Sequence, residues 1–217
     1  MRKTDPAAIN SAEFFKRSRA RLGFDVPPGL VDPNIIPKSG DHGTDRMLEI
    51  VAREQPVRPA AVLIPVVDHP QPTVLLTQRA AHLNDHAGQI SFPGGACDPH
   101  DAGLEATALR ETFEEIGVPP EAVEVLGALD DFPTISHFAV TPFVGIIPHP
   151  FPYRLHRREV EAVVEVPLSF LQDPAHVRAE QREHEGRIYD LLFWDYGPYT
   201  IWGATARVLQ SLLDLLR

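Results

Sequence analysis

Three glutamates, Glu111, Glu114 and Glu115, stand at positions i, i+3 and i+4 of a segment with helical periodicity, Leu104–Ile116. Residues three and four apart share one face of a helix, so the three carboxylates gather on one patch. Without a cation they repel one another, and each like-charge pair at this spacing costs a helix roughly 0.2–0.5 kcal/mol. A hard divalent cation turns this repulsion into attraction. Oxygen-only ligands favour Mg²⁺ or Mn²⁺ over zinc.

The same trio also has a simpler interpretation. Most glutamate trios are solvated acidic faces, and Arg110, four residues before Glu114, could steady such a face as an ion pair. The segment before the helix favours the metal site instead. Gly94 and Gly95 form a turn that lets backbone carbonyls and amides approach both an ion and a phosphate.

The stretch Gly95–Val118 resembles the signature of the Nudix hydrolases, G-x5-E-x7-R-E-U-x-E-E-x-G-U, in which U is a bulky aliphatic residue. Three features depart from it. Asp101 replaces the first glutamate and is separated from Arg110 by eight residues instead of seven, and Thr112 occupies an aliphatic position. The positions that match are Gly95, Arg110, Glu111, Glu114, Glu115, Gly117 and Val118.

This resemblance implies a fold and a reaction. The fold is an α+β, Nudix-type α/β/α sandwich with a mixed β-sheet and a loop-helix-loop metal motif. The reaction is hydrolysis of a diphosphate linked to another moiety, with Mg²⁺ or Mn²⁺ as cofactor.

The segment Leu75–Gly95 resembles a second element, LLTxR[SA]x3Rx3Gx3FPGG, which marks the coenzyme A pyrophosphatase branch. One position differs, since Asn84 stands where the pattern has arginine. That branch also tolerates the longer spacing and the aspartate at Asp101. The resemblance implies hydrolysis of coenzyme A, a small-molecule substrate, to 3′,5′-ADP and 4′-phosphopantetheine.

Two other functions remain open. The first is a Nudix hydrolase of ADP-ribose, a dinucleotide or a nucleoside triphosphate, for which Asn84 is the main support. The second is a ligand-sensing protein that has lost the chemistry. Such proteins usually lack a metal glutamate, and none is missing here.

The resemblance also assigns roles to residues. Glu111 and Glu115 are expected to bind the metal directly, with Glu114 as a third ligand or as the base that activates water. The Gly94 carbonyl is a further expected ligand. Arg110 is expected to orient the glutamates through salt bridges.

A further base is expected outside the helix. Glu159 is the candidate and Glu161 the runner-up, while a routine surface ion pair between Glu159 and Arg157 or Arg158 is the competing interpretation. The residues expected to contact substrate are Arg79, Gln89, Phe92 and Gly95.

Two regions follow from the pattern along the chain. Residues 1–57 read as an N-terminal extension, with a short amphipathic helix over Ser11–Leu22 capped by Ser11 and a Pro/Gly-rich connector behind it. Residues 58–217 read as the Nudix hydrolase domain. Its expected elements are a hairpin of Ala60–Val67 and Thr73–Thr77, strands at Gln89–Phe92, Val123–Leu129, Val140–Ile147, Val160–Val166 and Ile188–Trp194, and a last helix at Ala204–Leu216.

Composition excludes several classes of protein. The chain of 217 residues has 30 acidic and 20 basic side chains, a net charge of −10, which disfavours binding to nucleic acid. The longest apolar run, Ala60–Val67, is far shorter than the roughly 20 residues that span a bilayer. The N-terminus lacks the apolar core of a secretory signal. We therefore expect a cytoplasmic protein that does not enter membranes. Family members often dimerise, which leaves a homodimer open.

Overall fold

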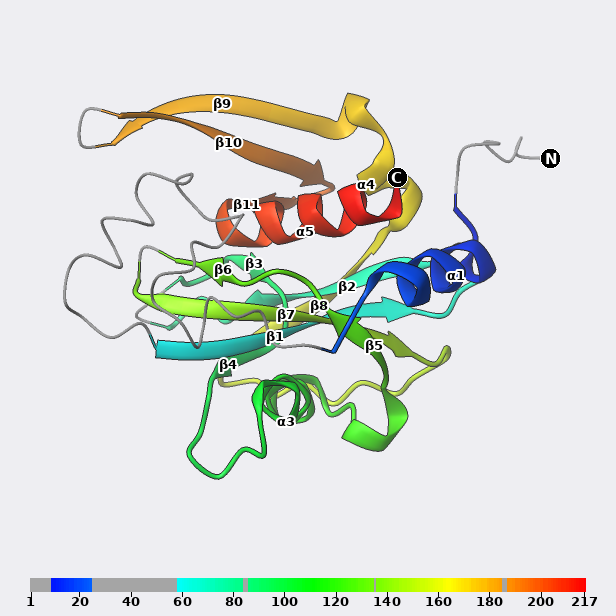
Figure 1. The fold of residues 1–217 in the computed structure, drawn as a ribbon. Helices are drawn as coiled ribbons and strands as arrows, with labels where there is room; N and C mark the ends of the chain where they lie inside the picture. Colours follow the sequence, from blue (N-terminus) through cyan, green and yellow to red (C-terminus); the bar gives the residue numbers. More distant parts are fainter. Residues whose placement is uncertain (1–8, 25–57, 84–85, 135, 185–186) are drawn as a thin grey trace.

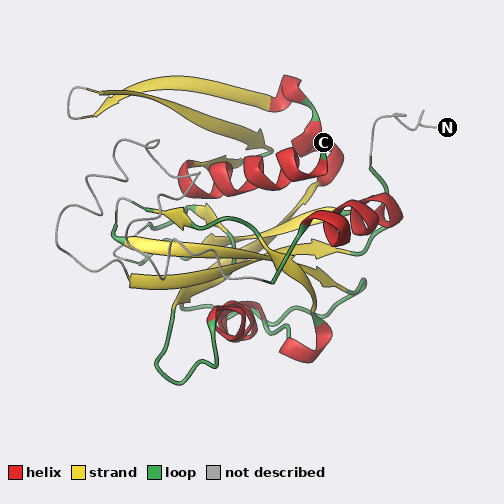
Figure 2. Ribbon diagram, in the orientation of Figure 1, coloured by secondary structure: helices red, strands yellow, loops and turns green. Residues whose placement is uncertain are grey.

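The computed structural model describes residues 9–24, 58–83, 86–134, 136–184 and 187–217 (Figure 1). Helix α3 (Leu104–Ile116) lies on one face of a large sheet, and helices α1 (Ser11–Arg21) and α5 (Gly203–Leu216) lie on the other. A smaller sheet lies beyond α5 (Figure 2). The expected α+β class, with a mixed sheet between helices, is confirmed.

The large sheet has eight strands, in the order β3-β2-β1-β7-β5, with β4 paired to β1, β6 to β7 and β8 to β2. The pairing of β1 with β7 is parallel, and the other pairings are antiparallel, so the sheet is mixed. Its strands are β1 (Arg58–Val67), β2 (Thr73–Arg79), β3 (Ile90–Ser91), β4 (Gly94–Ala96), β5 (Glu124–Ala128), β6 (Phe132–Pro133), β7 (Phe138–Ile147) and β8 (Val160–Pro167).

The central strand β1 is buried on both faces, which explains its unbroken apolar sequence. Ile64 and Val66 pack in the cluster that includes α5, whereas Ala61 and Leu63 pack in the cluster under α3. This alternation is the period of two that strand geometry imposes. The predicted hairpin is confirmed, because β1 and β2 pair antiparallel.

Helix α3 has the predicted bounds and the predicted end. Gly117 adopts the left-handed conformation, with φ 74°, and its N–H donates to the Phe113 carbonyl oxygen. A short 3₁₀ turn, η2 (Pro120–Ala122), then leads into β5.

The smaller sheet has three antiparallel strands, β11-β10-β9. The strand predicted at Ile188–Trp194 is confirmed within β10, but β10 belongs to this second sheet, which was not expected. Trp194 is fully buried between this sheet and α5, and its indole N–H donates to the Leu171 carbonyl oxygen at 3.3 Å. The remaining elements are β9 (Val177–His184), β10 (Arg187–Tyr196), β11 (Tyr199–Trp202), helix α4 (Leu168–Gln172) and the 3₁₀ turn η3 (Pro174–His176).

Helix α1 packs into the main core. Phe14 is fully buried in the same cluster as the apolar face of α5, and Arg17 and Arg21 donate to carbonyl oxygens at the end of α5. The helix is capped by Asn10, whose side chain accepts from the Glu13 amide, so the prediction of Ser11 as the cap is wrong by one residue.

The Pro/Gly-rich connector lies outside the described residues, and the boundary at residue 58 stays a prediction. Among the described residues, no helix has both the length and the apolar character needed to cross a membrane.

Candidate active site

Strand β4 brings a glycine pair against the glutamate face of α3. Gly95 pairs with Ala61 of β1, and a Cβ atom added to it would lie 2.6 Å from Cδ and Oε1 of Glu111. The Glu111 carboxylate therefore rests directly on the Gly95 backbone. Any residue with a side chain at position 95 would displace it.

Gly94 is required for a different reason. Its φ is 154°, and a Cβ there would lie 2.4 Å from the Ala61 carbonyl oxygen. Because this neighbour is backbone, it has little freedom to move away. The tight pairing of β4 on β1 therefore depends on glycine here.

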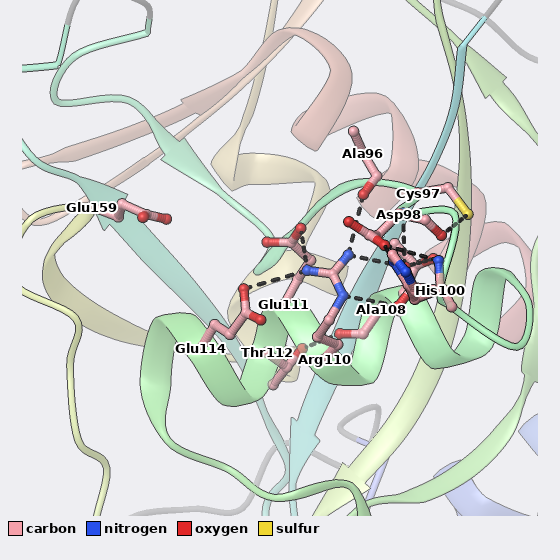
Figure 3. Close-up of polar contacts among 12 residues, drawn as sticks. Ala96, Cys97, Asp98, His100, Ala108, Arg110, Glu111, Thr112, Glu114 and Glu159 are labelled. Atoms are coloured by element: carbon pink, nitrogen blue, oxygen red, sulfur yellow. Dashed lines mark hydrogen bonds and ion pairs between the residues drawn. The ribbon is translucent and has the colours of Figure 1, made fainter.

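Arg110 holds several carboxylates at once, as the dashed contacts in Figure 3 show. Its guanidinium forms a bidentate pair with Asp101, with both N···O distances at 2.9 Å. Its Nη1 also donates to Glu111 Oε1 at 2.8 Å and to Glu114 Oε2 at 3.3 Å. These are the contacts expected of a residue that orients the glutamates.

Asp101 is the residue that the candidate site omitted. Its side chain is 7% exposed and also accepts from the Asp98 amide at 2.9 Å and from the Thr107 hydroxyl at 2.8 Å. The hydrogen bonds from Arg110 hold the pKa of the Asp101 carboxyl well below its usual range. Its place in the family signature was the available signal, and the longer spacing to Arg110 obscured its role.

Glu115 is the most deeply buried of the three glutamates, with 4% of its surface exposed. Burial and the nearby charge of Glu111 raise the pKa of Glu115 to about 8, while Arg79 and the Gly94 amide act in the opposite direction. Within the described part of the chain, its Oε2 has no hydrogen-bond partner. A buried carboxylate oxygen without a donor is an environment that a bound cation would satisfy.

The other two glutamates are less enclosed. Burial raises the pKa of Glu111 even though Arg110 opposes the shift, and the Glu114 side chain is 55% exposed. Both are turned toward Arg110. In the described ranges, no three His, Cys, Asp or Glu side chains lie close enough together to hold a metal ion in their present conformations.

The ends of β2 and β8 add a cation and a further carboxylate. The Ala80 amide, next to Arg79, donates to the Glu159 carbonyl oxygen at 2.8 Å. The charge of Glu159 contributes to the raised pKa values of Glu111 and Glu115. Figure 3 shows the Glu159 carboxylate apart from the Arg110 contacts and directed toward α3.

Glu159 lies against a histidine and not against the arginines that the sequence suggested as its partners. Nδ1 of His156 lies 3.2 Å from Glu159 Oε1. Arg157, one of the two arginines expected to compete for Glu159, donates instead to the Glu161 carbonyl oxygen at 2.6 Å.

The fold places the residues predicted to contact substrate in different environments. Gln89 lies beside Arg79, because its carbonyl oxygen accepts from the Arg79 amide at 2.9 Å. Phe92 is 5% exposed and packs in the core cluster of α5, so the structure does not bring it to the glutamates. Asn84 lies outside the described residues.

Comparisons with known proteins match most of this chain. The family model of the NUDIX domain matches residues 57–189. A relative from Salmonella paratyphi B, named "Uncharacterized Nudix hydrolase NudL", is 48% identical over 155 residues, 71% of this chain and 81% of the relative. A relative of the same name from Salmonella newport matches to the same extent. A solved Nudix hydrolase from Alicyclobacillus acidocaldarius is 21% identical, covering 74% of this chain and 93% of that chain, with a TM-score of 0.47.

Proposed function

This chain belongs to the Nudix hydrolase family and is a pyrophosphohydrolase of a nucleoside diphosphate derivative, and we propose that this derivative is coenzyme A. The proposed reaction adds water across the diphosphate bond. A new P–O bond forms to the water oxygen, the bridging P–O bond breaks, and the products are 3′,5′-ADP and 4′-phosphopantetheine.

The observation that carries the proposed metal-dependent hydrolysis is the buried Glu115 Oε2, which lies near the charges of Glu111 and Arg79 and has no donor among the described residues. Nudix hydrolases generally use divalent metal ions. We propose Mg²⁺ or Mn²⁺ here, because carboxylate and carbonyl oxygens suit these ions. Glu111, Glu115 and the Gly94 carbonyl would hold the ion, and Glu114 would join them by turning away from Arg110.

When bound, such an ion neutralises diphosphate charge and favours ionisation of the attacking water. The chain's own residues do the rest. Glu159 accepts the proton that the water loses, and Arg79 holds the anionic diphosphate. Arg110 keeps Glu111 in place without touching substrate. Its bidentate anchor is Asp101, which lies on the loop that precedes α3.

The choice of coenzyme A rests on the segment Leu75–Gly95, which resembles the recognition element of that branch. The described parts of this segment include the end of β2, strand β3 and the start of β4, and they contain Arg79 and the glycine pair of the candidate site. Asn84 supports the second candidate, another nucleoside diphosphate derivative such as ADP-ribose or a dinucleotide.

Product analysis distinguishes the two candidates. The purified protein is incubated with Mg²⁺ or Mn²⁺ and, separately, with coenzyme A, ADP-ribose, NADH, a diadenosine polyphosphate and dGTP. Ion-pair chromatography with mass spectrometry then identifies the products. Fastest turnover of coenzyme A to 3′,5′-ADP and 4′-phosphopantetheine is the expected result. Faster turnover of another substrate would reject coenzyme A and keep the metal site.

A further inference from the structure

The loop between β7 and β8 is attached to the C-terminal end of α3 through the main chain. The Arg154 amide donates to the Ile116 carbonyl oxygen at 2.9 Å, and the His156 amide donates to the Glu115 carbonyl oxygen at 2.9 Å. These two bonds satisfy carbonyl groups that the helix leaves open at its end. The backbone of His156 is therefore fixed relative to the helix that carries the glutamates.

The same residue also fixes the start of β8. The His156 carbonyl oxygen accepts from the amides of Glu159 and Val160, at 2.8 and 2.9 Å. Its ring returns to the same segment, with Nδ1 at 3.2 Å from Glu159 Oε1. The two side chains are 48% and 46% exposed, so the pair lies at the rim of the site, where an ion pair adds little to stability.

Glu159 lies between two parts of the site. On one side its main chain accepts from the Ala80 amide, next to Arg79. On the other side its carboxylate is directed toward α3 (Figure 3), close enough for its charge to affect Glu111 and Glu115. A carboxylate on a long, half-exposed side chain has many rotamers, so something must select this direction.

We propose that His156 is the positioning residue for Glu159, an inference that rests on the proposed role of Glu159 as the base. In this arrangement Nδ1 of His156 lies against Oε1, which leaves Oε2 of Glu159 to accept the proton from water. The main-chain bonds of His156 tie this arrangement to Glu115 on α3. His156 thus sets the distance between the base and the metal-binding glutamates without touching substrate.

Three substitutions at position 156 test which nitrogen of the His156 ring positions Glu159. The side-chain amide of asparagine can occupy the place of Nδ1, whereas that of glutamine occupies the place of Nε2. We expect His156→Asn to keep kcat within about twofold of the wild type. We expect His156→Gln and His156→Ala to lower kcat about tenfold with KM nearly unchanged, because a misplaced base slows the chemical step but not binding.

The control is His176, a histidine of similar exposure that lies near Asp173 and stacks on Phe170. His176→Ala removes a comparable ring from η3, which does not belong to the elements of the candidate site. We expect kcat to stay unchanged. Melting temperatures of all variants are measured in parallel. A variant at position 156 that lost kcat only in proportion to lost folded protein would contradict the positioning role.

A double-mutant cycle with Glu159→Gln separates this inference from the proposed function. We expect Glu159→Gln to lower kcat strongly and His156→Ala to have no further effect in that background. Two results would overturn only the role of His156 and leave the base assignment intact. The first is a slow Glu159→Gln variant together with full activity in His156→Ala. The second is an equal loss of kcat in the Asn, Gln and Ala variants at position 156. An unimpaired Glu159→Gln variant would overturn the base assignment and this inference with it. If coenzyme A is not hydrolysed, the cycle is run on the panel substrate that is.

Discussion

One side chain of the candidate site, Arg110, contacts several carboxylates at once. Arg110 joins Asp101, Glu111 and Glu114, so the charge that steadies the acidic face also sets where two glutamates point. Glu115 is excluded from this arrangement and stays buried without a donor to its Oε2, within the described residues. Arg110 therefore steadies Glu111 and Glu114, as the simpler interpretation of the trio predicts, whereas Glu115 has the environment on which the proposed metal site rests.

The contact between Gly95 and Glu111 predicts that the methyl group of alanine at position 95 lowers activity strongly. Gly95→Ala places a Cβ 2.6 Å from the Glu111 carboxylate, so Glu111 must move, and we expect kcat to fall on the order of 100-fold. Steady-state kinetics with Mg²⁺ check this.

Gly197→Ala is the matched control. This glycine has φ 59° and no atom within 4 Å of an added Cβ, so its replacement strains the backbone but reaches nothing. We expect lower stability with unchanged kcat. Equal kcat in Gly95→Ala and the wild type would show that Glu111 does not need its present position.

The Asp101–Arg110 pair predicts a stability effect that depends on pH. Asp101→Asn removes a charged, nearly buried partner of Arg110, and we expect a loss of about 1.5–3 kcal/mol in the free energy of unfolding at pH 7. Because the folded-state pKa of Asp101 is lowered, its contribution is present above the unfolded pKa of about 3.9 and is lost as the pH falls further.

Urea unfolding at pH 7 and pH 3 measures this difference. The difference in the free energy of unfolding between wild type and Asp101→Asn should be smaller at pH 3 than at pH 7. The exposed Asp214→Asn serves as the control, with an expected change below about 0.5 kcal/mol. A gap of the same size at both pH values would contradict a contribution from the ionised carboxylate.

At the scale of elements, the site is a junction of separate pieces of chain. Strand β4 supplies the glycines, α3 the glutamates, and the adjoining ends of β2 and β8 supply Arg79 and Glu159. Main-chain bonds from the loop before β8 to the end of α3 connect two of these pieces. Main-chain bonds thus fix the relative positions of these pieces.

Helix α1 shows that the N-terminal region contributes to the core. Phe14 is fully buried, so Phe14→Ala should lower the free energy of unfolding by about 3–5 kcal/mol. Phe24, which is 61% exposed, is the control, and Phe24→Ala should change it by less than about 0.5 kcal/mol. Chemical denaturation measures both. Similar small changes in the two variants would show that α1 adds little to stability.

At the scale of the whole molecule, an acidic chain must bind an anionic substrate. The net charge of −10 repels a diphosphate, so we expect binding to depend on local cations such as Arg79 and on the proposed metal, which would offset the charge of the glutamates. The core clusters on both faces of the large sheet are apolar and independent of that metal. We therefore expect the chain to fold without the proposed metal.

This expectation predicts the result of metal removal. A chelator should abolish hydrolysis while the far-UV circular dichroism spectrum stays native, and Mg²⁺ should restore activity. Added Mg²⁺ at about 100 times its Kd should stabilise the protein by about 2.7 kcal/mol, seen as a higher melting temperature. Glu115→Gln should lose this shift and the activity. Undiminished turnover in the chelated protein, or in Glu115→Gln, would reject the metal site.

The sequence alone determined the features that depend on local spacing. The bounds of α3, its glycine end, the β1–β2 hairpin and the glutamate face all follow from periodicity and turn chemistry, which act over a few residues. The family followed from the same signature.

Only the tertiary structure decided what depends on contacts between distant segments. Propensity could not show that β10 leaves the main sheet, that Phe92 faces the core, or that His156 rather than Arg157 meets Glu159. Nor could it show that Asp101 anchors Arg110 despite the altered spacing. Each of these is set by how strands pair and how loops pack, because spacing along the chain does not determine which side chains of distant segments meet.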